Sequence, residues 1–75
     1  MTTVDARGLL CPLPLTMARR RMAALRPGET LVVLATDPEA PIDMGAWAAA
    51  EGHALEERRL EGWTEFSLVK AGGSG

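Results

Sequence analysis

The chain has 75 residues, of which 47% are hydrophobic, and carries a formal net charge of -2. A domain of this size buries only roughly 60% of the surface that its unfolded chain exposes, so a second domain is excluded. Eight Lys and Arg residues stand against ten Asp and Glu residues, which argues against binding driven by nucleic-acid or membrane electrostatics. We expect one domain over residues 1–70 and a flexible Gly-rich tail over residues 71–75.

The numbers of cysteine and histidine residues limit the possible cellular compartments and the possible metal or disulfide sites. Cys11 and His53 are the sole residues of their kinds. They can form neither an internal disulfide nor a tetrahedral zinc site, so a reducing compartment is expected. The first residues do not resemble a signal peptide, and no apolar run approaches the ~20 residues of a membrane span. The expectation is a cytoplasmic protein without metal, cofactor or membrane partner.

The first half of the chain predicts a strand, a helix and a second strand. Thr2 to Asp5 suits a short edge strand. From Pro12 to Leu25, apolar residues recur at steps of three and four, which is one face of an amphipathic helix. Proline is favoured in the first turn of a helix, where Pro12 and Pro14 stand, and Pro27-Gly28 ends the helix. Residues 30–36, TLVVLAT, form a continuous β-branched and apolar run that predicts a central strand.

The second half predicts a shorter helix and a hairpin. Asp43 is expected to cap a helix that runs through Glu51 and ends at Gly52. Residues 53–60 and 63–70 flank Glu61-Gly62, a spacing typical of a two-residue hairpin turn. In the last strand, alternate side chains are expected to face inward, beginning with Phe66.

The predicted order is therefore βαβαββ. The economical packing is an α/β two-layer sandwich, with a four-stranded mixed sheet and both helices on one face. The leucines and valines, together with Trp47, Trp63 and Phe66, are expected to form the core.

Cys11 occupies the position where chemistry is most expected. At the start of a helix, a thiol is close to the positive end of the dipole and to free N–H groups, such as those of Leu13 and Leu15, and both favour the thiolate. Pro12 and Pro14 restrict the turn around it. The competing interpretation is that Cys11 is a small buried hydrophobic residue, and chemistry alone does not separate the two.

The motif around Cys11 resembles a known family. Residues 5–14 read DARGLLCPLP, residues 28–38 read GETLVVLATDP, and EGH follows at 51–53. Together with the length, this resembles the TusA/SirA-like sulfur carriers, whose hallmark is Cys-Pro-x-Pro at the start of the first helix. The resemblance implies the βαβαββ sandwich, a persulfide on Cys11, and motif roles for Pro12 and Pro14. Where other members often have Asp-Ile-Pro, this chain has Asp43-Met44-Gly45, which puts partner contacts or the helix start in doubt.

The resemblance also implies a mechanism. The Cys11 thiolate takes the outer sulfur of a persulfide presented by a cysteine desulfurase or rhodanese-type donor, and an acceptor thiol of another relay protein then removes it. Because there is no second cysteine, every transfer is intermolecular, and the chain turns over only with its partners. The family serves tRNA thiolation, cofactor sulfuration and sulfur oxidation, so the link to tRNA is indirect. A monomer is expected.

Two other functions compete with this interpretation. The first is a regulatory or interaction module of the same fold, in which Cys11 never carries sulfur. The second is a ubiquitin-like carrier that activates a terminal Gly-Gly, which is weak because Ser74-Gly75 follow Gly72-Gly73.

The remaining candidates are charged residues. Arg19, Arg20 and Arg21 form either a solvated helix face or a surface for an acidic partner or tRNA. Arg7, in the Arg7-Gly8 pair before the cysteine, could stabilise the thiol anion. Asp37 is expected in a turn and, from the resemblance, at a partner surface, whereas His53 is expected to pack or hydrogen-bond at a strand start.

Overall fold

The computed structural model describes residues 2–72 of the chain, which form four strands and two helices. In chain order they are β1 (Thr2–Ala6), α1 (Leu13–Ala23), β2 (Thr30–Ala35), α2 (Ala40–Glu51), β3 (Ala54–Leu60) and β4 (Trp63–Val69). This order confirms the predicted βαβαββ arrangement. Residues 73–75 of the expected tail lie outside the described residues. Neither of the two helices within 2–72 is long and apolar enough to cross a membrane.

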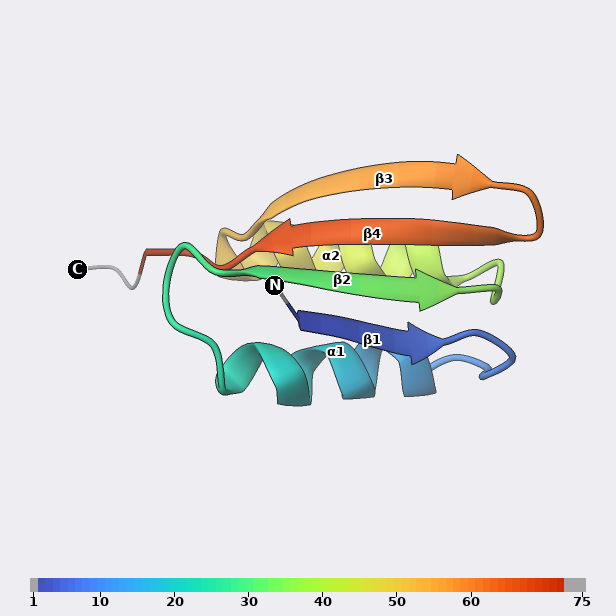
Figure 1. Cartoon of the computed structure of the whole chain (residues 1–75), viewed down its shortest axis with the longest axis horizontal. Coiled ribbons are helices and arrows are strands. Elements are labelled where there is room, and N and C mark those ends of the chain that lie inside the picture. The colour runs from blue at the N-terminus through green and yellow to red at the C-terminus, as the bar shows by residue number, and fades with distance from the viewer. Residues whose placement is uncertain (1, 73–75) are drawn as a thin grey trace.

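The strands form one mixed sheet in the order β1-β2-β4-β3. β1 and β2 are parallel and joined through α1, whereas β4 lies antiparallel to both β2 and β3. Figure 1 shows the four strands side by side, with α2 behind β2 and β4 and α1 running along β1 at the lower side of the view. The hairpin between β3 and β4 turns at Gly62, whose φ of 93° is readily adopted only by glycine. The predicted two-layer sandwich is thus confirmed.

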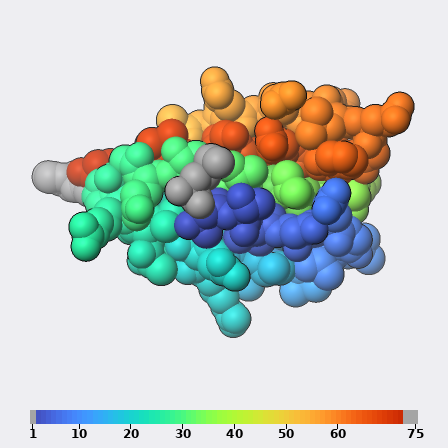
Figure 2. All heavy atoms as spheres, in the orientation of Figure 1, coloured from blue at the N-terminus to red at the C-terminus, as the bar shows by residue number. Residues whose placement is uncertain are grey.

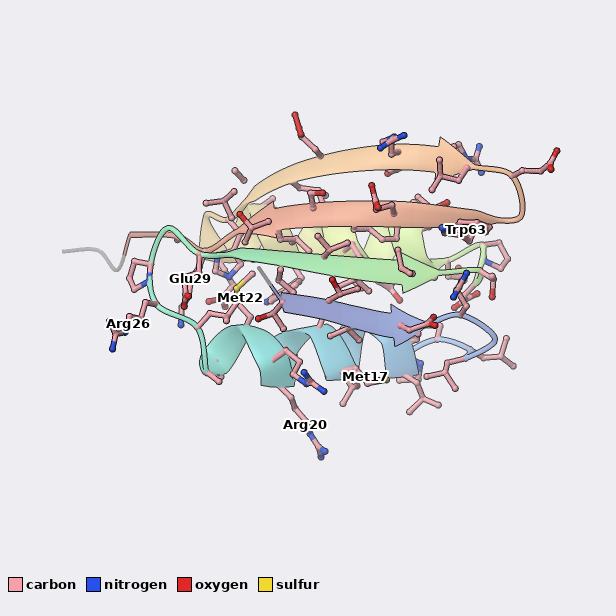
Figure 3. All side chains as sticks on the ribbon, viewed as in Figure 1. Met17, Arg20, Met22, Arg26, Glu29 and Trp63 are labelled. Carbon is pink, nitrogen blue, oxygen red and sulfur yellow. The ribbon has the colours of Figure 1, made fainter. Side chains whose placement is uncertain are left out.

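The core lies between the inner face of the sheet and the two helices. Leu31, Val33, Phe66 and Leu68 are fully buried there. From the helices, the buried side chains are Pro14, Ala18, Met22, Ala40, Met44 and Ala48. Figure 3 shows Met22 on the side of α1 that faces the sheet and Arg20 on the opposite side. The three- and four-residue periodicity of α1 therefore identified its buried face.

Trp63 does not belong to this core, so that part of the core prediction is wrong. It lies three residues before the buried Phe66 on β4, and successive side chains of a strand point to opposite faces. Trp63 is therefore on the outer face of the sheet, where the Arg7 guanidinium carbon lies 5.0 Å from its ring centroid.

The start of α2 also differs from the prediction. The helix begins at Ala40 and not at Asp43. Pro41 occupies the first turn, where a missing N–H has no cost, and Asp37 accepts hydrogen bonds from Glu39 N–H through Oδ1 and from Ala40 N–H through its carbonyl oxygen. Asp43 is consequently a first-turn residue, and its side chain makes no cap.

The parallel pairing of β1 and β2 places the segments that follow these two strands at the same edge of the sheet. Carboxyl ends of parallel strands meet at one edge, so the segment after β1 and the segment after β2 lie next to each other (Figure 1). Gly8, with a φ of 84°, donates its N–H to Thr36 Oγ1 at 2.8 Å across this junction. Residues far apart in the sequence are thereby brought together around Cys11.

Candidate functional site

Cys11 lies in the junction between β1 and α1, and its thiol is exposed. The competing prediction of a buried, structural cysteine is therefore wrong. In Figure 2 the segment that carries it lies on the molecular surface at the end of the molecule where the β3–β4 hairpin also turns. Its neighbours Leu10 and Leu13 are 71% and 49% exposed. An exposed thiol flanked by exposed apolar side chains suits contact with another protein surface.

Asp37 holds the backbone of this segment. Its Oδ2 accepts a hydrogen bond of 2.6 Å from Cys11 N–H, while its Oδ1 accepts one of 3.2 Å from Glu39 N–H. The side chain is almost fully buried, with 8% of the residue exposed. One carboxylate thus connects the start of α2 with the residue that carries the thiol. Asp37 lies behind the thiol and, in the isolated chain, presents little surface to a partner.

Asp43 contacts the thiol itself. The Cys11 thiol donates a hydrogen bond from Sγ to Asp43 Oδ2 at 2.9 Å. This hydrogen bond raises the pKa of Cys11 to about 11, aided by partial desolvation and by the negative charges of Asp43, Asp37 and Glu39. A carboxylate that accepts a hydrogen bond from the S–H group stabilises the protonated thiol. The thiol at this site is therefore a weaker acid than an ordinary cysteine.

This result reverses the expectation that the helix start favours the thiolate. Leu13 N–H, one of the donors proposed for the anion, instead donates to Leu10 O at 2.8 Å. The dipole at the first turn of a helix contributes only about 0.3–1 kcal/mol to a nearby anion. A carboxylate in direct hydrogen-bond contact outweighs it.

Arg7 is directed to other groups. Its side chain donates two hydrogen bonds of 2.9 Å to the carboxylate of Asp5, and the guanidinium lies over the ring of Trp63. The hydrogen bonds from Arg7 lower the pKa of Asp5 to about 2. The guanidinium that was expected to support the thiol anion is thus bound to Asp5 on the outer face of the sheet.

The predicted arginine run lies at the other end of α1. Arg19, Arg20 and Arg21 are all exposed, and Arg20 points away from the sheet in Figure 3. Arg20 follows Leu13 by seven residues, which is roughly 10 Å along the helix axis. The structure therefore separates the arginine run from the thiol.

His53 lies at the same distant end, as a packing residue at a strand start. Its Nδ1 accepts a hydrogen bond of 2.9 Å from Ala71 N–H, and its ring meets that of Trp47 edge-on at 5.2 Å. Within residues 2–72, no group of three or more His, Cys, Asp or Glu side chains is placed to hold a metal ion.

Sequence reasoning missed the contact between Cys11 and Asp43. The two residues are 32 positions apart, and Asp43 was expected to cap α2. With the helix starting at Ala40, Asp43 lies within its first turn, and its carboxylate contacts Cys11. The one available signal was the prolines at 38 and 41, which favour an earlier start.

Fold and site together define a small α/β sandwich protein with an exposed thiol just ahead of its first helix. The family model described as Sulfurtransferase TusA matches residues 2–70. The chain therefore belongs to the TusA family, which confirms the resemblance seen in the sequence.

Two known proteins illustrate this relationship. YrkF of Bacillus subtilis (strain 168), a candidate sulfur carrier protein by its description, is 37% identical over 70 residues, which are 93% of this chain and 38% of YrkF. The chain thus spans well under half of that relative. The crystal structure of a SirA-like protein from Desulfitobacterium hafniense superimposes with a TM-score of 0.86 at 27% identity, over 95% of this chain and 99% of that one.

Proposed function

We propose that this chain is a sulfur carrier in which Cys11 holds a transferable sulfur as a persulfide. The observation that carries the proposal is the exposed Cys11 thiol, presented at the head of α1 in a member of the TusA family. Exposed Leu10 and Leu13 on either side of the thiol, and Ile42 next to Asp43, offer apolar area to a docking protein. A buried cysteine would have argued against the proposal.

The proposed transfer conserves atoms and electrons. The Cys11 sulfur, as thiolate, bonds to the outer sulfur of a donor persulfide while the donor's S–S bond breaks. The electron pair of that bond stays on the donor's inner sulfur, which leaves as a thiolate and takes up the proton that Cys11 released. An acceptor thiol later attacks the outer sulfur on Cys11 in the same way, so no oxidant or reductant is needed.

The proposed partners are proteins. A cysteine desulfurase or a rhodanese-type protein is the donor, and a relay protein with a reactive thiol is the acceptor. The sulfur would go on to tRNA thiolation, cofactor sulfuration or sulfur oxidation, in the cytoplasm. Because the chain has one cysteine, it cannot release sulfur as an internal disulfide and depends on those partners at each step.

The other motif residues are proposed to support the presentation of the thiol. Gly8 allows the tight turn after β1, and the buried Pro14 with Pro12 shapes the start of α1. Arg7 supports the same segment indirectly through Asp5. The arginine run is proposed as a docking surface for an acidic region of the donor, at a distance from the thiol.

Intact-mass measurement tests the proposal. After incubation with a cysteine desulfurase, cysteine and pyridoxal phosphate, we expect the protein to gain the mass of one sulfur atom, and the gain to be lost on treatment with a thiol reductant. Cys11→Ser is expected to abolish the gain completely. Its thermal midpoint is expected to stay within a degree or two, because the exchange is nearly isosteric at an exposed site.

A regulatory module without sulfur chemistry is the second candidate, and the hydrogen bond from the Cys11 thiol to Asp43 favours it. This contact raises the pKa of Cys11 and so leaves little thiolate near neutral pH. An unchanged mass under conditions that load another carrier would support this candidate and refute the sulfur carrier. Loading that persists in Cys11→Ser would refute the assignment of the site.

A further inference from the structure

The charges around Cys11 are of one sign. Asp43 accepts a hydrogen bond from the thiol, Asp37 accepts one from the Cys11 N–H, and Glu39 adds its charge from the residue before α2. A carrier that reacts as a thiolate is thus surrounded by groups that oppose the thiolate. These carboxylates come from the junction before α2 and from its first turn, which lies next to the thiol.

Among residues 2–72, no cation forms an ion pair with these carboxylates. The two ion pairs among the described residues are Arg7 with Asp5 and Arg58 with Glu65, and neither includes a carboxylate near the thiol. The last turn of α1, with its basic residues, is roughly 10 Å from the start of that helix. Arg59 of β3 lines the same surface pocket as Asp37 and Pro41 but forms an ion pair with neither Asp37 nor Asp43. Asp43 thus has no cationic partner among residues 2–72 and can accept one from another molecule.

From this geometry we propose that Asp43 keeps Cys11 protonated in the free protein, and that a lysine or arginine of the sulfur donor releases the thiol by pairing with Asp43. The proposal rests on the sulfur-carrier function above and adds a condition to it. Asp43 contacts Sγ, the atom that attacks the donor's outer sulfur, and acts by controlling whether that atom is protonated. The free carrier is thereby protected from electrophiles and oxidants, and the docked carrier reacts.

The contact itself explains how pairing would work. Asp43 is half-buried and reaches Sγ through Oδ2. A guanidinium or ammonium that binds the carboxylate draws its charge away from the thiol and, in an interface that excludes water, is more effective than in solution. The proton that Cys11 then loses goes to the donor's leaving thiolate, as in the balanced transfer above.

The expected size of the effect follows from the acidity of the thiol. The rise of the Cys11 pKa from 9.0 to about 11 lowers the thiolate fraction at about pH 8 by roughly a hundredfold. The intrinsic nucleophilicity of a thiolate rises with its pKa, with a slope of about 0.4–0.5, and this restores roughly tenfold. Because desolvation and two other carboxylates remain, Asp43→Asn should raise the rate of Cys11 alkylation about five- to tenfold.

The first measurement is the rate of iodoacetamide alkylation of the whole chain from neutral pH upward. Asp43→Asn is expected to react faster and to shift the pH profile of the rate to lower pH. Asp43→Glu, which keeps a carboxylate, should restore much of the slow rate. The matched control is Glu51→Gln, which removes the same charge from the other end of α2 and should leave the rate unchanged. Equal rates for Asp43→Asn and the parent protein would overturn the proposal.

The second measurement compares two sulfur sources by intact mass. Inorganic polysulfide carries no docking surface, so Asp43→Asn should be loaded about five- to tenfold faster than the parent. With a cysteine desulfurase as donor, Asp43→Asn should load no faster than the parent, because the bound donor already neutralises Asp43 in the parent and the variant offers the donor's cation no carboxylate. The same acceleration with both sources would overturn the release step.

The two proposals fail in different ways. If neither source loads the parent protein, the sulfur-carrier function is refuted together with the release step, whereas the alkylation profile still decides whether Asp43 holds the thiol proton. Thermal unfolding of each variant shows that the rates compare folded proteins.

Discussion

The two ends of α1 differ in which residues determine their chemical properties. At the first end, the hydrogen bond to Asp43, 32 residues away in the sequence, is the main cause of the raised pKa of Cys11, and Asp37, 26 residues away, accepts a hydrogen bond from the Cys11 N–H. At the last end, the exposed arginines belong to the helix itself and suit the negative end of its dipole. The properties of the first end thus depend on tertiary contacts, whereas those of the last end depend on the sequence of the helix itself. We expect substitutions at the first end to change chemistry and stability together, and those at the last end to change neither strongly.

The largest effect in this comparison is expected for Asp37→Ala. The substitution leaves the N–H groups of Cys11 and Glu39 without their acceptor in a partly buried junction. Hydrogen bonds to a charged group contribute about 1.5–3 kcal/mol, so we expect a loss of about 2 kcal/mol of unfolding free energy. For a domain of this size, the thermal midpoint should fall by roughly 10 °C.

The control for this prediction is the adjacent carboxylate. Glu39 is exposed, and Glu39→Gln should change the unfolding free energy by less than about 0.5 kcal/mol. Calorimetry of both variants decides the comparison. If both variants had the same midpoint as the parent, the buried hydrogen bonds of Asp37 would not stabilise the junction.

A smaller effect is expected at the last end of α1, where Lys70 Nζ donates to the carbonyl oxygens of Met22 and Leu25 at 3.0 and 2.7 Å. Lys70→Met keeps an apolar stem of similar length and removes both hydrogen bonds. We expect a loss of about 1 kcal/mol, measured by urea unfolding, without change in the alkylation rate of Cys11. A faster alkylation rate would show that the two ends of α1 are coupled, contrary to the comparison.

The smallest effect is expected when Arg19, Arg20 and Arg21 are all replaced by Gln. The three side chains are exposed, so the unfolding free energy should change by less than about 0.5 kcal/mol and the alkylation rate should not change. Transfer from a cysteine desulfurase is then measured at two salt concentrations. Slower transfer that appears at low salt alone would assign the run to docking, since salt screens exposed charges beyond ~8–10 Å. Equal transfer would leave it as a solvated helix face.

Much of the fold could be predicted because its signals are local. The apolar periodicity from Leu15 to Leu25 predicted the buried face of α1, and the Glu61-Gly62 spacing predicted the hairpin. Trp63 was misassigned because its large apolar ring suggested burial. Side chains alternate between the two faces of β4, and Trp63 falls on the outer face. The residue type alone does not predict on which face of the sheet an aromatic side chain lies.

The site was predicted in part. The Cys-Pro-x-Pro motif at the head of a helix was enough to identify Cys11 as the reactive candidate, whereas the choice between an exposed and a buried thiol needed the structure. The sequence did not reveal the state of that thiol. Helix-terminus reasoning predicted a more acidic thiol, and the structure shows a less acidic one.

The sequence by itself determined the order of the strands and helices, the face of each helix that packs on the sheet, and the single cysteine that is the candidate site. These depend on periodicity, turn residues and the count of cysteines, which are properties of neighbouring positions. Only the tertiary structure decided what surrounds the sulfur, because the parallel pairing of β1 with β2 brings the start of α2 next to the start of α1. A hydrogen bond acts over about 3 Å, so Asp43 affects Cys11 only once the chain has folded.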